Sequence, residues 1–196
     1  MSGDQLMSLD DAVKVLCTEL QYPQDRAMHF VKRFDKNQDG KLSAEEFSAF
    51  KAKIAETKEA LVPKFKEYDR DGNGFITLEE ASQILQSHPF NFPATKVCVL
   101  LKNFDKDGNG KLDIEEFAGF YAEAKATHED LAGRFDQMDK DGNGILSPDE
   151  VTCVIQELMG YDEKTARYFV TMFDKNQDGS LDKAEFIHMW TDMFGI

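Results

Sequence analysis

Five twelve-residue segments of the chain carry oxygen-bearing side chains at the same spacing. They begin at Asp35, Asp69, Asp105, Asp139 and Asp174. Each has a carboxylate or amide at its first, third and fifth places, Gly at its sixth and Glu at its twelfth. Calcium is a hard cation that takes about 6–8 oxygen ligands at about 2.3–2.6 Å, and this spacing wraps a short loop around it. Five matches in succession predict an array of calcium sites.

The strongest candidate ligands are the acidic and amide side chains. Places one, three and five supply one oxygen each, from Asp35, Asn37, Asp39; Asp69, Asp71, Asn73; Asp105, Asp107, Asn109; Asp139, Asp141, Asn143; and Asp174, Asn176, Asp178. Place twelve supplies both carboxylate oxygens, from Glu46, Glu80, Glu116, Glu150 and Glu185. A bidentate Glu favours the higher coordination number of Ca²⁺ over the stricter octahedron of Mg²⁺.

The other places shape the loop and complete the ligand set. Place seven donates a backbone carbonyl, so its side chain varies: Lys41, Phe75, Lys111, Ile145 and Ser180. Place nine usually binds through water, and holds Ser43, Thr77, Asp113, Ser147 and Asp182. Place eight is aliphatic in every loop, and we expect it to point into the core while its backbone pairs with a partner loop.

Differences among the loops predict an order of affinity. The Asp105 and Asp174 loops have Asp at place nine and four acidic residues each. We expect these two loops to bind most tightly and to hold Mg²⁺ in resting cells. The Asp35 loop has three acidic residues and no intact loop upstream of it. We therefore expect it to bind most weakly.

The elements that position these loops follow from a repeat. Loop starts are 34, 36, 34 and 35 residues apart, and apolar residues recur at the helical period on both sides of each loop. The residues after the loops alternate between two types, so the full unit is two helix–loop–helix hands. The predicted fold is all-α, with three pairs of hands and short strands between paired loops. Thr57 and Thr127, each twelve residues before a loop, are predicted to cap helix starts.

The first loop lacks an intact partner, and the N-terminus supplies a remnant of one. Residues 8–40 align without gaps against residues 147–179. This predicts a vestigial hand that keeps its exiting helix but has lost its metal loop; an unrelated helix is the alternative. The predicted segments are 1–56, 57–126 and 127–196. The first loop could use Gln5–Leu9 as its strand or pair with a second copy of the chain, so the oligomeric state stays open.

This loop pattern resembles that of the EF-hand superfamily, and the resemblance covers residues 8–196. It implies hands paired face to face, as in calmodulin-like and sarcoplasmic calcium-binding proteins. The implied function is reversible Ca²⁺ binding, without catalysis, in the cytoplasm.

The composition supports this class of function. The net charge is −14, from 23 basic and 37 acidic residues, which argues against nucleic-acid partners. Five bound Ca²⁺ ions would bring the formal charge to −4. The N-terminus is acidic and lacks the apolar core of a secretory signal. We expect the three cysteines to be free thiols and the four histidines to be ordinary helix or surface residues. We also expect no membrane anchor.

Two roles fit a calcium-binding protein of this kind. A calcium buffer stays closed with metal bound, and this is the reading we put first. A calcium sensor opens a groove for an amphipathic target helix. Met138, Met159, Met172, Met189, Met193 and Trp190 lie in the last third of the chain. They either pack the core or line such a groove, since Met is adaptable. A ligand-holding photoprotein-like bowl fits poorly, because there is one Trp.

Overall fold

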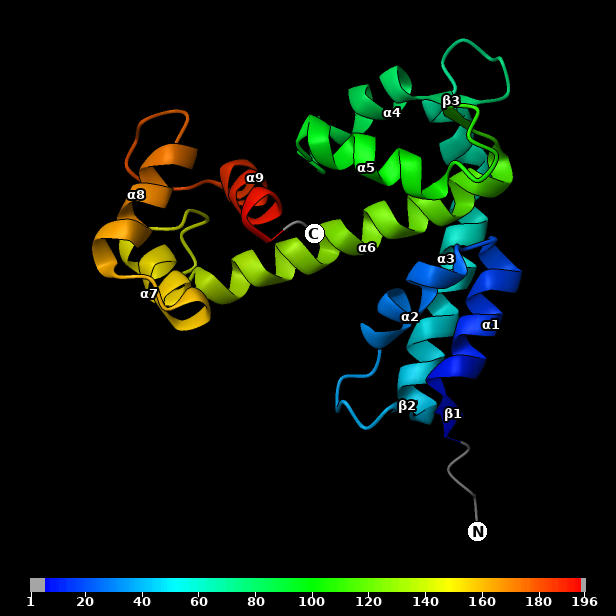
Figure 1. Cartoon of the computed structure of the whole chain (residues 1–196), viewed down its shortest axis with the longest axis horizontal. Coiled ribbons are helices and arrows are strands. Elements are labelled where there is room, and N and C mark those ends of the chain that lie inside the picture. Colours follow the sequence, from blue (N-terminus) through cyan, green and yellow to red (C-terminus); the bar gives the residue numbers. More distant parts are fainter. Residues whose placement is uncertain (1–5, 195–196) are drawn as a thin grey trace. The chain divides into compact units, whose positions relative to one another are not determined.

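The computed structural model describes residues 6–194, which form helices joined by loops and very short strands (Figure 1). The helices are α1 (Leu9–Leu20), α2 (Gln24–Lys32), α3 (Ala44–Tyr68), α4 (Leu78–Leu85), α5 (Ala94–Phe104), α6 (Ile114–Met138), α7 (Pro148–Met159), α8 (Glu163–Phe173) and α9 (Lys183–Phe194). The strands are β1 (Met7–Ser8), β2 (Lys41–Leu42), β3 (Ile76–Thr77) and β4 (Lys111–Leu112). The predicted all-α class is confirmed.

Two helices run through positions where new helices were expected to start. α3 and α6 each span 25 residues, and Figure 1 shows both as unbroken ribbons. Thr57 and Thr127 lie inside them, so the prediction that these residues cap helix starts is wrong. The segments around them are rich in Ala, Lys and Glu, which are strong helix formers. The Thr57 hydroxyl instead donates to the carbonyl of Lys53 at 2.9 Å, as Thr does inside helices.

The predicted segment boundaries at 56/57 and 126/127 therefore fall within continuous helices. The described chain forms two compact units, residues 6–82 with 98–124 and residues 83–97 with 125–194. In the first unit the most deeply buried side chains include Phe30, Phe50, Phe104 and Phe117. In the second they include Leu146, Ile155, Phe186 and Met189. The division into three segments stays a prediction about how the hands pair.

Paired loops meet at their eighth places. β3 and β4 are antiparallel, with Ile76 opposite Leu112. Leu146 and Leu181 form an isolated antiparallel bridge, with N···O distances of 2.8 and 2.9 Å. All four side chains are fully buried. The second loop thus pairs with the third, and the fourth with the fifth.

The first loop pairs with the N-terminal segment of the same chain. β1 lies antiparallel to β2, with Met7 opposite Leu42. Ser8 aligns with the ninth place of the fourth loop, so Met7 stands at the eighth place of the missing loop. The contact therefore has the register of the intact pairs. Of the strand suggested over Gln5–Leu9, Gln5 lies outside the described residues.

The vestigial hand and the fourth hand have matching helices. α1 begins and ends 139 residues before α7, and the starts of α2 and α8 are also 139 residues apart. Ser8 caps α1 as Ser147 caps α7. Both helices end in a left-handed residue, Gln21 with φ 50° and Gly160 with φ 68°. These shared bounds and caps support a vestigial hand over an unrelated helix.

Candidate metal centres

The first Asp of each loop anchors the turn through backbone amides. In the second loop, Asp69 Oδ1 accepts from the amide of Asn73 at 3.0 Å and its Oδ2 accepts from that of Gly74 at 2.9 Å. The same two bonds recur in the other four loops, between 2.8 and 3.2 Å. The bonds draw the first carboxylate toward the loop centre, where a metal ligand is needed.

Places three and five form a second set of contacts. Asp71 Oδ1 accepts from the amide of Asn73 at 3.0 Å, and Asn73 Oδ1 accepts from that of Phe75 at 2.8 Å. The Asn73 side-chain amide also donates to Asp71 at 2.8 Å. In the first and fifth loops the two residue types are exchanged, and Asn37 donates to Asp39 at 3.1 Å. Each loop therefore sets one neutral amide beside one carboxylate.

The Glu at place twelve holds the two ends of its loop together. Glu80 Oε1 accepts from the amide of Arg70 at 3.0 Å, and its Oε2 accepts from that of Thr77 at 2.9 Å. All five loops repeat this pattern, between 2.7 and 3.1 Å. Glu80, Glu116 and Glu185 are buried, and the other two are half-buried. Both oxygens are thus fixed at the rim of the loop.

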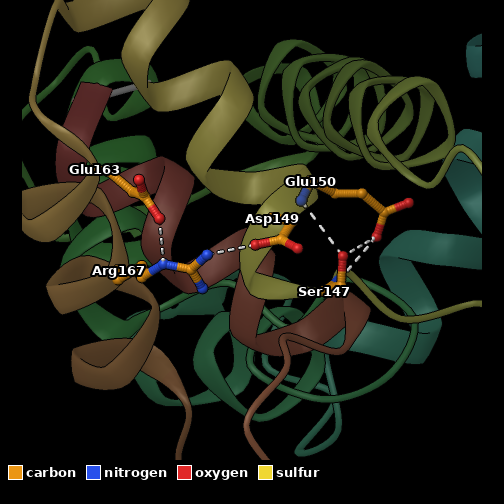
Figure 2. Close-up of polar contacts among 5 residues, drawn as sticks. All are labelled: Ser147, Asp149, Glu150, Glu163 and Arg167. Carbon is orange, nitrogen blue, oxygen red and sulfur yellow. Dashed lines mark hydrogen bonds and ion pairs between the residues drawn. The ribbon is translucent and has the colours of Figure 1, made fainter.

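Place nine starts the exiting helix. The Ser147 hydroxyl accepts from the amide of Glu150 at 3.3 Å, and the Glu150 carboxylate accepts from the backbone amide of Ser147 at 2.9 Å, which makes a capping box (Figure 2). Asp113 and Asp182 cap their helices in the same way, each accepting at 2.9 Å. The amides of Ser43 and Ser147 lower the pKa of Glu46 and Glu150 respectively, although desolvation opposes the shift. Both carboxylates are therefore ionised at neutral pH and ready to take a cation.

Backbone conformation separates the loops into two types that the motif did not distinguish. The Gly at place six has φ between 79° and 85° in every loop. Place four is also left-handed: it is Gly in the second, third and fourth loops but Gln38 in the first and Gln177 in the fifth, with φ 59° and 60°. Left-handed backbone is strained for residues with a Cβ. The exchange of DGNG for NQDG in the sequence was the available signal.

Three loops bring carboxylates from places one, three and twelve close together. The ligand oxygens lie within 4.8 Å of one another in the sets Asp69, Asp71, Glu80; Asp105, Asp107, Glu116; and Asp139, Asp141, Glu150. Like charges at this range repel, so the arrangement is suited to a cation between them. The donors are all hard oxygens, as Ca²⁺ and Mg²⁺ require. The residues present therefore fit a calcium ion, and in the first and fifth loops Asn replaces Asp at place three.

The sequence pattern of the EF-hand domain pair matches residues 58–122 and 128–191, and that of the single EF hand matches residues 32–51. The chain belongs to the EF-hand family. All five loop starts lie within the matched residues. The protein accordingly binds calcium through its EF-hands, while the individual ligand assignments and the number of ions remain predictions.

The chain is similar to several plant proteins. It is 34% identical over 127 residues to calcium-dependent protein kinase 22 of Arabidopsis thaliana, covering 64% of this chain and 26% of the kinase. It is 42% identical over 57 residues to the calcium-binding protein CML24 of that plant, covering 28% of this chain and 35% of CML24. It is 37% identical over 70 residues to polcalcin Aln g 4 of Alnus glutinosa, covering 34% of this chain and 82% of the polcalcin. This EF-hand chain thus spans about a quarter and about a third of the first two relatives.

A solved homolog of programmed cell death 6 protein from Leishmania major Friedlin is 27% identical, covering 65% of this chain and 71% of its own, with a TM-score of 0.43. That score adds nothing to the family assignment. Within residues 6–194, no helix is both long enough and apolar enough to cross a bilayer.

Proposed function

We propose that this EF-hand protein is a calcium sensor that binds an amphipathic helix through its last pair of hands. The observation that carries the proposal is a set of exposed apolar side chains, Leu158, Tyr161, Tyr168 and Met172, which we call the α8 surface. Their exposed fractions are 57%, 42%, 63% and 56%. Tyr168 and Met172 are four residues apart and share one face of α8. Tyr168 and Met172 therefore form an exposed apolar face of the kind that marks interaction sites.

The vestigial pair provides an internal comparison. At a shift of 139 residues, the positions of the α8 surface correspond to Glu19, Tyr22, His29 and Arg33. Three of these are polar or charged, and Tyr22 is 3% exposed. Two pairs whose helices start at matching positions therefore differ in chemistry at these residues. That difference supports a binding role for the last pair.

An ion-pair network ties α7 to α8 beside this surface. Arg167 on α8 donates to Asp149 on α7 at 2.5 Å and to Glu163 at 3.0 Å (Figure 2). Asp149 lies at place eleven of the fourth loop, next to Glu150. We propose that the two helices move together when the fourth loop takes metal, which would carry the α8 surface with them.

The partner we propose is a basic helix with one apolar face. The chain carries a net charge of −14, and the surface itself is apolar, so a basic amphipathic helix complements both. We further propose up to five Ca²⁺ ions, Mg²⁺ at the Asp105 and Asp174 loops in resting cells, and action in the cytoplasm without catalysis.

A calcium buffer is the second candidate, and the core of the last pair favours it. Met138, Met189 and Trp190 are buried and so pack the core, whereas Met172 is exposed. A buffer would keep this closed arrangement with metal bound.

Dye binding and Trp190 emission separate the two roles. Trp190 is 3% exposed and stacks on Phe194 at 4.4 Å between ring centroids, so its emission reports changes in this core. A sensor should bind more of a hydrophobic dye when Ca²⁺ is added in the presence of Mg²⁺. Compaction without added dye binding would instead support a buffer.

Peptide binding then tests the surface itself. We expect calcium-dependent binding of a helical peptide of Leu and Lys residues to the wild-type chain. The double variant Tyr168→Ser, Met172→Ser should weaken binding at least about tenfold, which is about 1.4 kcal/mol. Val62→Ser, which removes a residue of 50% exposure on α3, is the matched control and should bind normally. Equal binding by the double variant and the control would overturn the proposed surface.

A further inference from the structure

A polar cluster joins the first pair of hands to the third hand. Arg33 donates two hydrogen bonds to the carboxylate of Glu123, Nη1 to Oε2 at 2.9 Å and Nη2 to Oε1 at 3.0 Å. The Tyr22 hydroxyl also donates to Glu123 Oε2. The Arg33 and Glu123 side chains are only 17% and 14% exposed. We call these three residues the Glu123 cluster; all of them belong to the first compact unit.

The cluster lies close to two metal loops in the covalent chain. Arg33 stands two residues before Asp35, the first ligand of the first loop. Glu123 stands seven residues after Glu116, the last ligand of the third loop, and both lie on α6. Residues seven apart share one face of a helix. A shift of Glu116 along or about the helix axis therefore moves Glu123 with it.

A second contact joins the same two hands. Lys106, at the second place of the third loop, donates its Nζ to the carbonyl of Gln21 at 2.5 Å. Its backbone amide donates to Glu116 at 2.7 Å. Gln21 ends α1 of the vestigial hand. Lys106 therefore links the two hands: its side chain binds the vestigial hand, and its backbone binds Glu116 of its own loop.

Close packing beneath the cluster makes the connection stiff. The Tyr22 ring packs against Phe104 and Phe30, with centroids 5.2 Å apart in both cases. Phe104 immediately precedes the third loop. A Cβ at Gly119 of α6 would lie 2.9 Å from the Phe104 ring, so α6 approaches α5 as closely as Gly permits. Tightly packed contacts of this kind transmit displacements and do not absorb them.

We propose that the Glu123 cluster couples the first and third metal loops, so that filling either one raises the affinity of the other. The cluster occurs together with the loop arrangement in which the Glu46 and Glu116 carboxylates each accept from the backbone amides of places two and nine. Each loop held in that arrangement favours the helix positions that the other needs. The first loop, expected to be weak because its partner lost its metal, gains support from the third hand. This proposal rests on calcium binding alone and does not involve the α8 surface.

The last pair of hands has no equivalent of the Glu123 cluster at the matching positions. Met172 stands where Arg33 stands in the first pair, and Tyr161, which replaces Tyr22, is 42% exposed. The last pair therefore lacks the contacts through which we propose that the first and third loops are coupled.

Calcium titration followed by nuclear magnetic resonance reports each loop of the full chain separately. The Gly40 amide donates to Asp35 at 3.0 Å and the Gly110 amide to Asp105 at 2.8 Å, so their signals report the first and third loops. Disabling the third loop by Glu116→Gln should raise the calcium concentration at the Gly40 midpoint about fivefold or more. In a Glu123→Gln background the same change should shift that midpoint less than about twofold.

Three further variants make the result specific. Glu67→Gln removes the same charge two residues before the second loop, where Glu67 pairs with Lys64 within α3, and it should leave the coupling intact. Tyr22→Phe keeps the ring packing and Arg33→Lys keeps the charge, and each should reduce the coupling. If Glu123→Gln fails to fold, Tyr22→Phe and Arg33→Lys test the coupling in its place.

An unchanged Gly40 midpoint when the third loop is disabled would overturn the coupling. So would an equal shift in the wild-type and Glu123→Gln backgrounds. A Gly40 signal that never responds to Ca²⁺ would overturn both the coupling and metal binding by the first loop. The sensor proposal would stand in each case, since dye and peptide binding test it independently.

Discussion

The Glu at place twelve contacts the backbone at both ends of its loop. Its two oxygens accept from the amides of places two and nine, so one side chain closes the loop and starts the exiting helix. Because all five loops share these contacts, differences in affinity should come from the number of acidic ligands and from what supports each loop.

Place-twelve variants test the predicted order of affinity. Glu116→Gln and Glu185→Gln should each remove a tight step from a calorimetric calcium titration, because their loops carry four acidic residues. The loss at the altered loop should exceed the ~10–100-fold that removal of an outer-shell partner costs. Glu46→Gln should remove a weak step. Loss of the tightest step in Glu46→Gln would show that the order is wrong.

Place four offers a matched pair of changes within one pair of loops. Gly142→Gln puts a Cβ at φ 69° in the fourth loop and should lower the free energy of unfolding by about 1 kcal/mol. Gln177→Gly relieves the same conformation in the fifth loop and should raise it by a smaller amount, since Gly also gains entropy when unfolded. Urea unfolding of metal-free protein, followed by Trp190 emission, measures both. Changes of the same sign would contradict the argument.

Glu150 gives a pH dependence with a definite sign. The Ser147 amide lowers its pKa below the ordinary 4.5 in the folded protein. A carboxylate with a lowered folded pKa stabilises the fold above its unfolded pKa, and this contribution is lost as pH falls through the folded value. When the pH is lowered from about 5 to about 3, the melting temperature of metal-free Glu150→Gln should therefore fall less than that of the wild type. An equal fall in the melting temperatures of the two proteins would show that Glu150 does not contribute to the loss of stability at low pH.

At the scale of elements, α3 and α6 join successive hands without a break. In these two cases the exiting helix of one hand is also the entering helix of the next. The predicted ligand Glu116 and the cluster residue Glu123 both lie on the part of α6 that belongs to the first unit. The coupling proposed for the first and third loops depends on that continuity.

Lys58→Pro tests the continuity of α3. If a helix started at Thr57, Pro at the next position would be tolerated. Inside a continuous helix it should cost about 3 kcal/mol or more. Lys58→Ala is the control, because Lys58 also pairs with Glu19 at 2.5 Å. Urea unfolding followed by circular dichroism measures both, and equal stability of the two variants would place a helix boundary at Thr57.

At the scale of the whole molecule, charge links metal to stability. A net charge of −14 destabilises the metal-free fold by self-repulsion, and each bound ion both neutralises charge and binds the folded state selectively. One filled site adds about 4 kcal/mol when free calcium is about 1,000 times its dissociation constant.

Removing calcium should therefore lower the melting temperature strongly. Adding NaCl to the chelator-treated protein should recover part of the loss, because salt screens the repulsion. Adding Ca²⁺ should recover all of it. A melting temperature that is insensitive to the chelator would contradict the linkage.

The sequence predicted the loops and their pairing better than it predicted the helices and surfaces around them. The all-α class and the pairing of loops through their eighth places were predictable, as was the register of the vestigial hand, while the ligand assignments stay predictions. The helix starts predicted at Thr57 and Thr127 were wrong, because a local capping signal lost to strong helix formers on both sides. The sequence spacing of the Met residues alone could not show that Met172 is exposed while Met138 and Met189 are buried.

The sequence by itself determined the metal loops, because each loop's ligands and hydrogen bonds fall within twelve consecutive residues. Only the tertiary structure decided which surfaces stay exposed and which hands are joined. Arg33 and Glu123 are 90 residues apart in the chain, and their contact depends on the packing of Tyr22, Phe104 and Gly119. Contacts between distant segments depend on the packing of the whole unit, so a local sequence pattern does not predict them.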